Sequence, residues 1–170
     1  METKHFAILL IALAGCVTDL RSRRIPNVLT FGAALAGIAF HALAPQGEGL
    51  GVAALGWTIG VAAFFIPFAL GGLGGGDIKL LGALGAWLGP SGTVWLVLYT
   101  GVAGGVMAIG VSIASGYGRQ ALSNIYLLLS HWRVSGLRAL PQITLAESKA
   151  PKLAYALPIF AGTVVAVWLA

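Results

Sequence analysis

The chain has 170 residues, of which 58% are hydrophobic and only 9% are charged, and its mean hydropathy is +0.93. A soluble domain carries about 25% charged residues, so this composition excludes a water-soluble domain and predicts one compact integral membrane domain over 1–170. The net charge of +5 does not indicate nucleic-acid binding, because the basic residues lie in loops beside apolar segments, as membrane orientation requires.

A helix that crosses about 30 Å of hydrocarbon needs roughly 20 apolar residues. Six apolar segments come near this length, so we expect an all-α fold, a polytopic membrane protein with about six transmembrane helices. The first, METKHFAILLIALAGCVTDL, has the outline of a signal peptide without a cleavage site, and we expect it to be retained. The six segments are 5–19, 28–44, 50–71, 78–95, 97–115 and 153–170, and Gly89-Pro90 interrupts the fourth.

Basic residues gather in alternate connections between these segments. Six crossings place the connections 19–27, 72–79 and 116–152 on one side of the membrane, and these hold nine of the ten Lys and Arg residues, all except Lys4. The positive-inside rule predicts that this side is cytoplasmic and that both termini lie outside. Asp19 and Asp77 are then expected near the same membrane surface.

The 116–152 connection has a helical pattern of its own. From Ser123, the expected N-cap, apolar residues recur at near-helical spacing with basic residues between them. We interpret this pattern as an amphipathic helix on the cytoplasmic leaflet, with Trp132 at headgroup level; an ordinary amphipathic connector is the alternative. The apolar residues are Ile125, Leu128, Leu129, Trp132 and Leu140, and the polar ones are His131, Arg133 and Arg138.

Glycine is abundant, with 25 residues in the chain. Two small residues spaced four apart let transmembrane helices approach closely. Three such pairs lie in the apolar segments and indicate helix packing sites: Gly56/Gly60, Gly85/Gly89 and Gly101/Gly105.

The chain contains only two aspartates, and both stand at the edge of an apolar segment. Asp19 ends the first segment, and Asp77 follows the glycines of GGLGGGDIKL, residues 71–80. A carboxylate near the membrane core costs about 2.5–3.5 kcal/mol, so acids there indicate function. The structural alternative is that each aspartate only pairs with a nearby base: Asp19 with Arg21, Arg23 or Arg24, and Asp77 with Lys79.

Two neighbouring carboxylates do not both ionise readily, so they share one proton. One can take a proton from water as the water attacks a peptide carbonyl, while the other protonates the carbonyl oxygen and later the leaving amine. Gly74, Gly75 and Gly76 fit this chemistry, because residues without a Cβ permit unusual dihedrals and a close approach by a substrate strand. The pattern predicts peptide hydrolysis at the membrane.

The same residues resemble a known family. Gly74-Gly75-Gly76-Asp77 resembles the G-x-G-D motif of intramembrane aspartyl proteases, and DIKLLGALGAWLG resembles the following helix of type IV prepilin peptidases. DLRSRRIPN, residues 19–27, resembles the first aspartate and the I-P-N of that family. The resemblance covers essentially the whole chain and implies that Asp19 and Asp77 are the catalytic pair.

The resemblance also implies a partner and a location. The substrate would be a prepilin, cleaved after a glycine at the cytoplasmic face of a bacterial cytoplasmic membrane. Larger members carry a cysteine-bearing segment and also methylate the new N-terminus; Cys16 is the only cysteine here, so we expect no methyl transfer. The small form resembles the peptidases of tight-adherence (Flp-type) pilus systems, and Flp-type prepilins are the expected substrates. Many relatives have proline before the tyrosine of the last segment, whereas Ala154 precedes Tyr155 here, and no role is assigned to that tyrosine.

Weaker expectations concern the remaining polar residues. Lys79 is a weak candidate for contact with an acidic substrate residue, and a snorkelling anchor is its alternative. The three histidines are scattered, so we expect no metal and no other cofactor. The oligomeric state is open. Two other functions stay open: a small ion- or proton-coupled carrier with paired carboxylates, although carriers more often have repeated halves and midplane sites, and a non-catalytic scaffold of a secretion machine.

Overall fold

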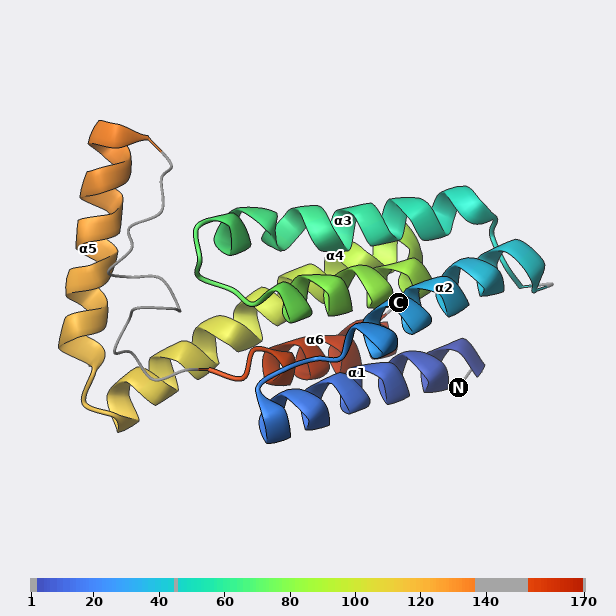
Figure 1. Cartoon of the computed structure of the whole chain (residues 1–170), viewed down its shortest axis with the longest axis horizontal. Coiled ribbons are helices and arrows are strands. Elements are labelled where there is room, and N and C mark those ends of the chain that lie inside the picture. The colour runs from blue at the N-terminus through green and yellow to red at the C-terminus, as the bar shows by residue number, and fades with distance from the viewer. Residues whose placement is uncertain (1–2, 45, 137–152, 170) are drawn as a thin grey trace.

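The computed structural model of the chain describes residues 3–44, 46–136 and 153–169, and every regular element in these ranges is a helix (Figure 1). The all-α prediction is therefore confirmed. Two of the helices, α2 and α6, are apolar but shorter than a typical membrane span, whereas α1, α3 and α4 are long and apolar enough to cross a membrane. The helices are α1 (Thr3–Ser22), α2 (Asn27–Leu43), α3 (Leu50–Ala69), α4 (Gly75–Ala114), α5 (Gly118–Ser135) and α6 (Ala156–Leu169).

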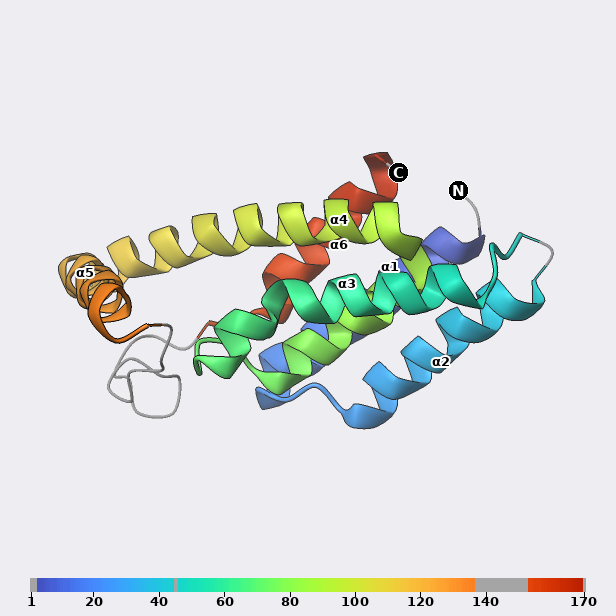
Figure 2. The same cartoon turned by 90° about the horizontal axis from the view of Figure 1, so that it is seen from above.

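Helix α4 contains a reversal of direction. At Gly89 the backbone has φ 69° and ψ −177°, and Pro90 follows, which supplies no N–H and opposes a continuous helix. The first arm (75–88) and the second arm (90–114) therefore run back along each other, as Figure 2 shows. Thr93 Oγ1 closes the turn by donating to the Gly89 carbonyl at 2.5 Å and to the Gly85 carbonyl at 3.3 Å.

This reversal corrects one predicted boundary. The break expected between residues 95 and 97 lies at Gly89. Segment length predicts this break too late in the chain. The apolar residues continue through the turn, and they show no alternation of polar and apolar positions that would mark the end of a helix. With the two arms counted separately, the bundle contains the six apolar segments that the sequence predicts.

The connections gather at the two ends of the bundle. Residues 23–26, residues 70–74 and the start of α6 lie at one end, which we call the aspartate end (Figures 1 and 2). The start of α1, the α2–α3 connection, the α4 turn and the end of α6 lie at the other. Asp19 and Asp77 therefore share one end, as expected, and Lys4 lies at the opposite one. Arg138, Lys149 and Lys152 lie outside the described residues.

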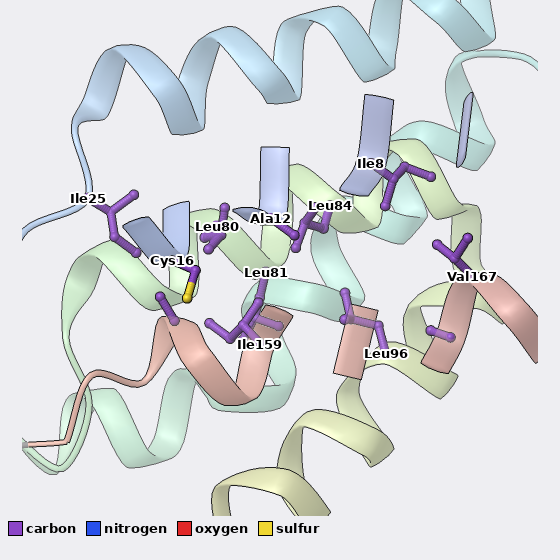
Figure 3. Close-up of a cluster of buried hydrophobic side chains, with 12 residues drawn as sticks. Ile8, Ala12, Cys16, Ile25, Leu80, Leu81, Leu84, Leu96, Ile159 and Val167 are labelled. Atoms are coloured by element: carbon purple, nitrogen blue, oxygen red, sulfur yellow. The ribbon is translucent and has the colours of Figure 1, made fainter. Parts of the chain in front are cut away.

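The bundle is apolar both inside and outside. Ile8, Leu81, Leu96 and Ile159, from α1, both arms of α4 and α6, are fully buried and belong to one hydrophobic cluster (Figure 3). The outward faces carry large apolar side chains that are more than half exposed, among them Phe6, Leu35, Leu55, Phe65, Val102 and Ile109. Exposing so much apolar surface to water is unfavourable, so these faces are expected to contact the hydrocarbon of a bilayer. The fold is that of a polytopic membrane protein.

Glycine brings α3 and the first arm of α4 into backbone contact. A Cβ added to Gly56 would overlap the carbonyl oxygen of Gly85, and one added to Gly60 would lie 2.5 Å from the carbonyl oxygen of Leu81. The predicted packing role is confirmed for this pair. It is wrong for Gly101 and Gly105, where an added Cβ meets nothing within 4 Å.

Gly56→Ala is accordingly expected to lower the free energy of unfolding by about 1–3 kcal/mol, because the methyl group must push two backbones apart. Gly101→Ala is the matched control: it adds the same methyl group on an open helix face, where alanine is favoured over glycine by up to about 1 kcal/mol. Thermal unfolding of both variants in one detergent would measure this. Equal losses would contradict the assigned α3–α4 contact.

Helix α5 lies across the aspartate end of the bundle, nearly perpendicular to the bundle axis (Figures 1 and 2). It begins at Gly118, not at Ser123, because Gly116 with φ 68° ends α4 and the Ala121 N–H already donates to the Tyr117 carbonyl at 2.9 Å. Ser123 is thus inside the helix and does not cap it. Leu122, Ile125 and Leu129 are exposed, which fits the amphipathic interpretation; Arg138 and Leu140 lie outside the described ranges.

Candidate active site

The two aspartates lie on different helices and face one cavity. Asp19 is in the last turn of α1 and Asp77 in the first turn of α4, and each side chain is only 8% exposed. Both line a cavity of about 400 Å³. The remaining lining residues come from the two connections at this end and from the first residues of α2 and α4: Arg23, Arg24, Ile25, Pro26, Asn27, Gly74, Gly75 and Gly76.

The start of α6 contacts Asp19 from outside the set of residues that line the cavity. The backbone N–H of Ala156 donates to Asp19 Oδ2 at 3.4 Å and joins residues 137 positions apart in the chain. Tyr155 packs at the same place, between the ring of Phe64 at 5.9 Å and the second arm of α4, where a Cβ on Gly104 would lie 2.6 Å from its hydroxyl. Nothing local in the sequence marks α6 as part of this site, because the contact depends on how the bundle closes.

The three glycines before Asp77 have separate structural roles. A Cβ on Gly74 would lie 2.9 Å from Asp77 Oδ2, and one on Gly76 would lie 3.2 Å from the Cβ of Ile25. At Gly75 the added Cβ would only reach ordinary contact with Phe68, at 3.4 Å. Gly74 thus leaves room for the carboxylate, and Gly76 lets α4 approach the 23–27 connection.

The expectation that these glycines adopt unusual dihedrals is wrong. Gly74 has φ −78° and ψ 145°, which any residue can adopt, and Gly75 and Gly76 open α4. Within the 71–76 stretch only Gly71 has a positive φ, of 75°. The requirement at Gly74 and Gly76 is space, not backbone freedom.

The segment Ile25-Pro26-Asn27 follows α1, which carries Asp19, and contacts α4, which carries Asp77. Ile25 is buried against Gly76. Asn27, the first residue of α2, accepts a hydrogen bond through Oδ1 from Lys79 Nζ at 3.0 Å. Lys79 also lies over the ring of Phe31, 5.4 Å from its centroid, and it stands outside the set of residues that line the cavity. Its observed contacts therefore tie α4 to α2.

Arg23 has an uncommon backbone conformation beside the site. Its φ is 53°, and its N–H donates to the Asp19 carbonyl at 2.8 Å, so it ends α1 in the left-handed conformation that glycine usually supplies. A side chain in this region costs about 1–2 kcal/mol. The chain nevertheless has arginine at this position, and Arg23 lines the cavity.

This strain can be measured by comparing two variants. Arg23→Gly and Arg23→Ala both remove the guanidinium group and its contacts, but only Arg23→Gly also removes the Cβ. Arg23→Gly is therefore expected to exceed Arg23→Ala in free energy of unfolding by about 1 kcal/mol, measured by thermal or denaturant unfolding in detergent. Equal stabilities would show that α1 does not end at Arg23 in this way.

Two buried carboxylates in one glycine-walled cavity, at the end of an apolar helical bundle, define a membrane-embedded protein with a paired-acid site. A family model described as the type IV leader peptidase family matches residues 6–109, more than half of the chain, including both aspartates. The chain belongs to this family: it is a membrane peptidase of the prepilin peptidase type, with prepilin-type substrates. Searches of curated proteins and of solved structures found no match.

Proposed function

We propose that the protein is an aspartyl endopeptidase in which Asp19 and Asp77 form the catalytic dyad. The observation that carries the proposal is that the only two aspartates of the chain, 58 positions apart in the sequence, line the same cavity while each is only 8% exposed. Lys79, the base nearest to Asp77 in sequence, bonds to Asn27, so the simple pairing of Asp77 with Lys79 does not account for this carboxylate.

The dyad holds one proton between two carboxyl groups. The ionised carboxylate takes a proton from a water molecule as its oxygen attacks the scissile carbonyl carbon. The protonated carboxyl gives its proton to the carbonyl oxygen, which yields a neutral tetrahedral intermediate. When the C–N bond breaks, one carboxyl gives its proton to the leaving amine and the other carboxylate takes a proton from a hydroxyl of the intermediate, so the dyad again holds one proton.

The wall of the cavity suits an extended peptide. Gly74, Gly75 and Gly76 present backbone without side chains next to Asp77, so a substrate strand can approach the carboxylate closely. A cavity of about 400 Å³ takes the residues around the scissile bond, and the rest of the substrate lies outside it. The hydrogen bond from the Ala156 N–H to Asp19 Oδ2 connects this aspartate to the start of α6.

The proposed setting is a bacterial cytoplasmic membrane. The aspartate end carries Arg21, Arg23, Arg24 and Lys79, and we propose that it faces the cytoplasm with both termini outside. A prepilin then presents its cleavage site at that surface, where its apolar helix leaves the bilayer. Flp-type prepilins are the proposed substrates, and 1–170 acts as a single domain without methyltransferase activity.

The site does not favour the carrier alternative. Ion-coupled carriers place their sites near the middle of the membrane, between repeated halves with broken helices. Here one aspartate lies in the last turn of its helix and the other in the first turn of its own, so the pair lies at one end of the bundle.

Cleavage of a purified prepilin tests the proposal directly. The protein reconstituted in lipid is expected to release the leader of a Flp-type prepilin after a glycine, and mass spectrometry of both products identifies the bond and shows whether the new amino group is methylated. A substrate whose glycine at this position is replaced by valine is the control and should remain intact. If several prepilins stay uncut while the reconstituted protein conducts protons, the carrier interpretation replaces this one.

A further inference from the structure

A second cavity, of about 380 Å³, lies at the end of the bundle opposite to the aspartates. Its lining residues come from the start of α1, the α2–α3 connection, the start of α3, the two arms of α4 at their turn and the end of α6; Figures 1 and 2 show these segments at this end of the bundle. Its polar and aromatic lining consists of Lys4, His5, Glu48, Trp87, Ser91 and Trp95. None of these residues belongs to the peptidase site.

The cavity wall is held by buried hydrogen bonds. His41 is 4% exposed; its Nδ1 accepts the Glu48 backbone N–H at 3.3 Å, and its Nε2 lies 3.2 Å from the Trp87 carbonyl oxygen. Trp87 in turn donates Nε1–H to the Ala33 carbonyl at 2.8 Å and stacks on Phe40 at 5.5 Å. One buried histidine therefore contacts the backbone of both Glu48 and Trp87, two residues that line the cavity.

The charges around the cavity are of both signs. Lys4 and His5 come from the start of α1, and Glu48 comes from the α2–α3 connection. The second arm of α4 begins here at Pro90 with the positive end of its helix dipole, whereas the first arm and α6 end here with their negative ends. A ligand with one anionic and one cationic group complements this arrangement better than a simple anion, because a simple anion would meet Glu48 unfavourably.

The surroundings of the cavity suit a lipid. Lysine and tryptophan at helix ends lie at the headgroup level of a bilayer. Leu169 lines the cavity and is 62% exposed, and Phe6, the residue after His5 on α1, is 57% exposed. Apolar surface thus continues from the cavity onto the outside of the bundle, where acyl chains lie.

We propose that this cavity binds the headgroup of a phosphatidylethanolamine in the leaflet opposite to the aspartates. The phosphate lies beside Lys4 and the α4 turn, and the ammonium donates to Glu48. Phosphatidylcholine is also zwitterionic, but its methylated ammonium has no N–H to donate to a carboxylate, so it is expected to bind more weakly.

Native mass spectrometry of the purified protein in detergent tests this with three lipids of identical acyl chains. Phosphatidylethanolamine is expected to bind at least about tenfold more tightly than phosphatidylcholine or phosphatidylglycerol, which corresponds to about 1.4 kcal/mol. Glu48→Gln should remove this preference while keeping the backbone bond to His41. Lys4→Gln should weaken the binding of all three lipids. Arg119→Gln, which removes a cation at the other end of the bundle, should leave the binding of all three unchanged.

Each other outcome would overturn the proposal. Equal binding of the three lipids by the wild type, or a preference that survives in Glu48→Gln, excludes recognition of the headgroup at this cavity. Glycerophosphoethanolamine, which has no acyl chains, serves as a further probe: if it competes at the same concentration as the whole lipid, the site takes a soluble ligand. Thermal unfolding of each variant without lipid confirms that the comparison is between folded proteins.

Discussion

Replacing Asp19 or Asp77 by asparagine is expected to lower the rate of prepilin cleavage by roughly 10²–10⁴-fold, the range assigned to loss of a general acid or base. Asparagine keeps the shape of the side chain but cannot take up or release the proton that the reaction moves. The Asp19→Asn/Asp77→Asn double variant should be about as slow as either single variant, because the two carboxyls act as one unit. Initial rates of leader release in lipid measure all three.

The controls for this experiment separate chemistry from folding. Each asparagine variant should keep the thermal midpoint of the wild type, since an amide fills the same volume and can still accept the Ala156 N–H at position 19. Glu147→Gln makes the same chemical change at another acid of the chain and should cleave normally. A folded Asp19→Asn or Asp77→Asn protein that cleaves at the wild-type rate would show that these aspartates are not the dyad.

Gly74→Ala is expected to reduce cleavage by roughly 10–100-fold with little loss of stability. Its Cβ would lie 2.9 Å from Asp77 Oδ2, so the carboxylate must move, and misplacing a catalytic group by about 1 Å can cost about 10² in rate. The backbone at Gly74 has φ −78° and ψ 145°, which alanine adopts without strain. The expected result is therefore an active-site defect in a protein that unfolds at the wild-type temperature.

Gly75→Ala provides the comparison. Its Cβ reaches only ordinary contact with Phe68, at 3.4 Å, and it leaves Asp77 where it is. The two variants thus separate two reasons for glycine here. A larger loss at Gly74 supports placement of the carboxylate, whereas equal losses would mean that the glycines mainly give the peptide access to the backbone. Loss of folding in Gly74→Ala would contradict the described geometry.

Much of the site could be predicted from local sequence. Asp19, Asp77 and the three glycines were predicted together because they stand at the edges of apolar segments, on connections that alternate sides. The structure places all of them around one cavity. The contribution of Ile25-Pro26-Asn27 was visible only as a motif, and its physical role, packing on Gly76 and binding Lys79, required the folded chain.

The fold was predictable in class but not in every boundary. Composition alone implies a lipid-facing helical bundle, and the number of apolar segments puts the two aspartates at the same end. The turn in α4 was misplaced, because residues on all sides of these helices are apolar and the sequence has no amphipathic period that marks an end. The start of α5 was misplaced because Gly116, not a polar cap, ends the preceding helix.

By itself, then, the sequence determined that this protein is a membrane-embedded helical bundle with two acids near one surface, since apolar length and the alternation of connections are local properties. Only the tertiary structure decided that α6 reaches Asp19, that Gly74 makes room for Asp77, that Lys79 bonds to Asn27 and that a charged cavity forms at the far end. Each of these depends on contacts between residues distant in the chain, and in a chain whose helices are apolar on every face, packing alone selects which faces meet.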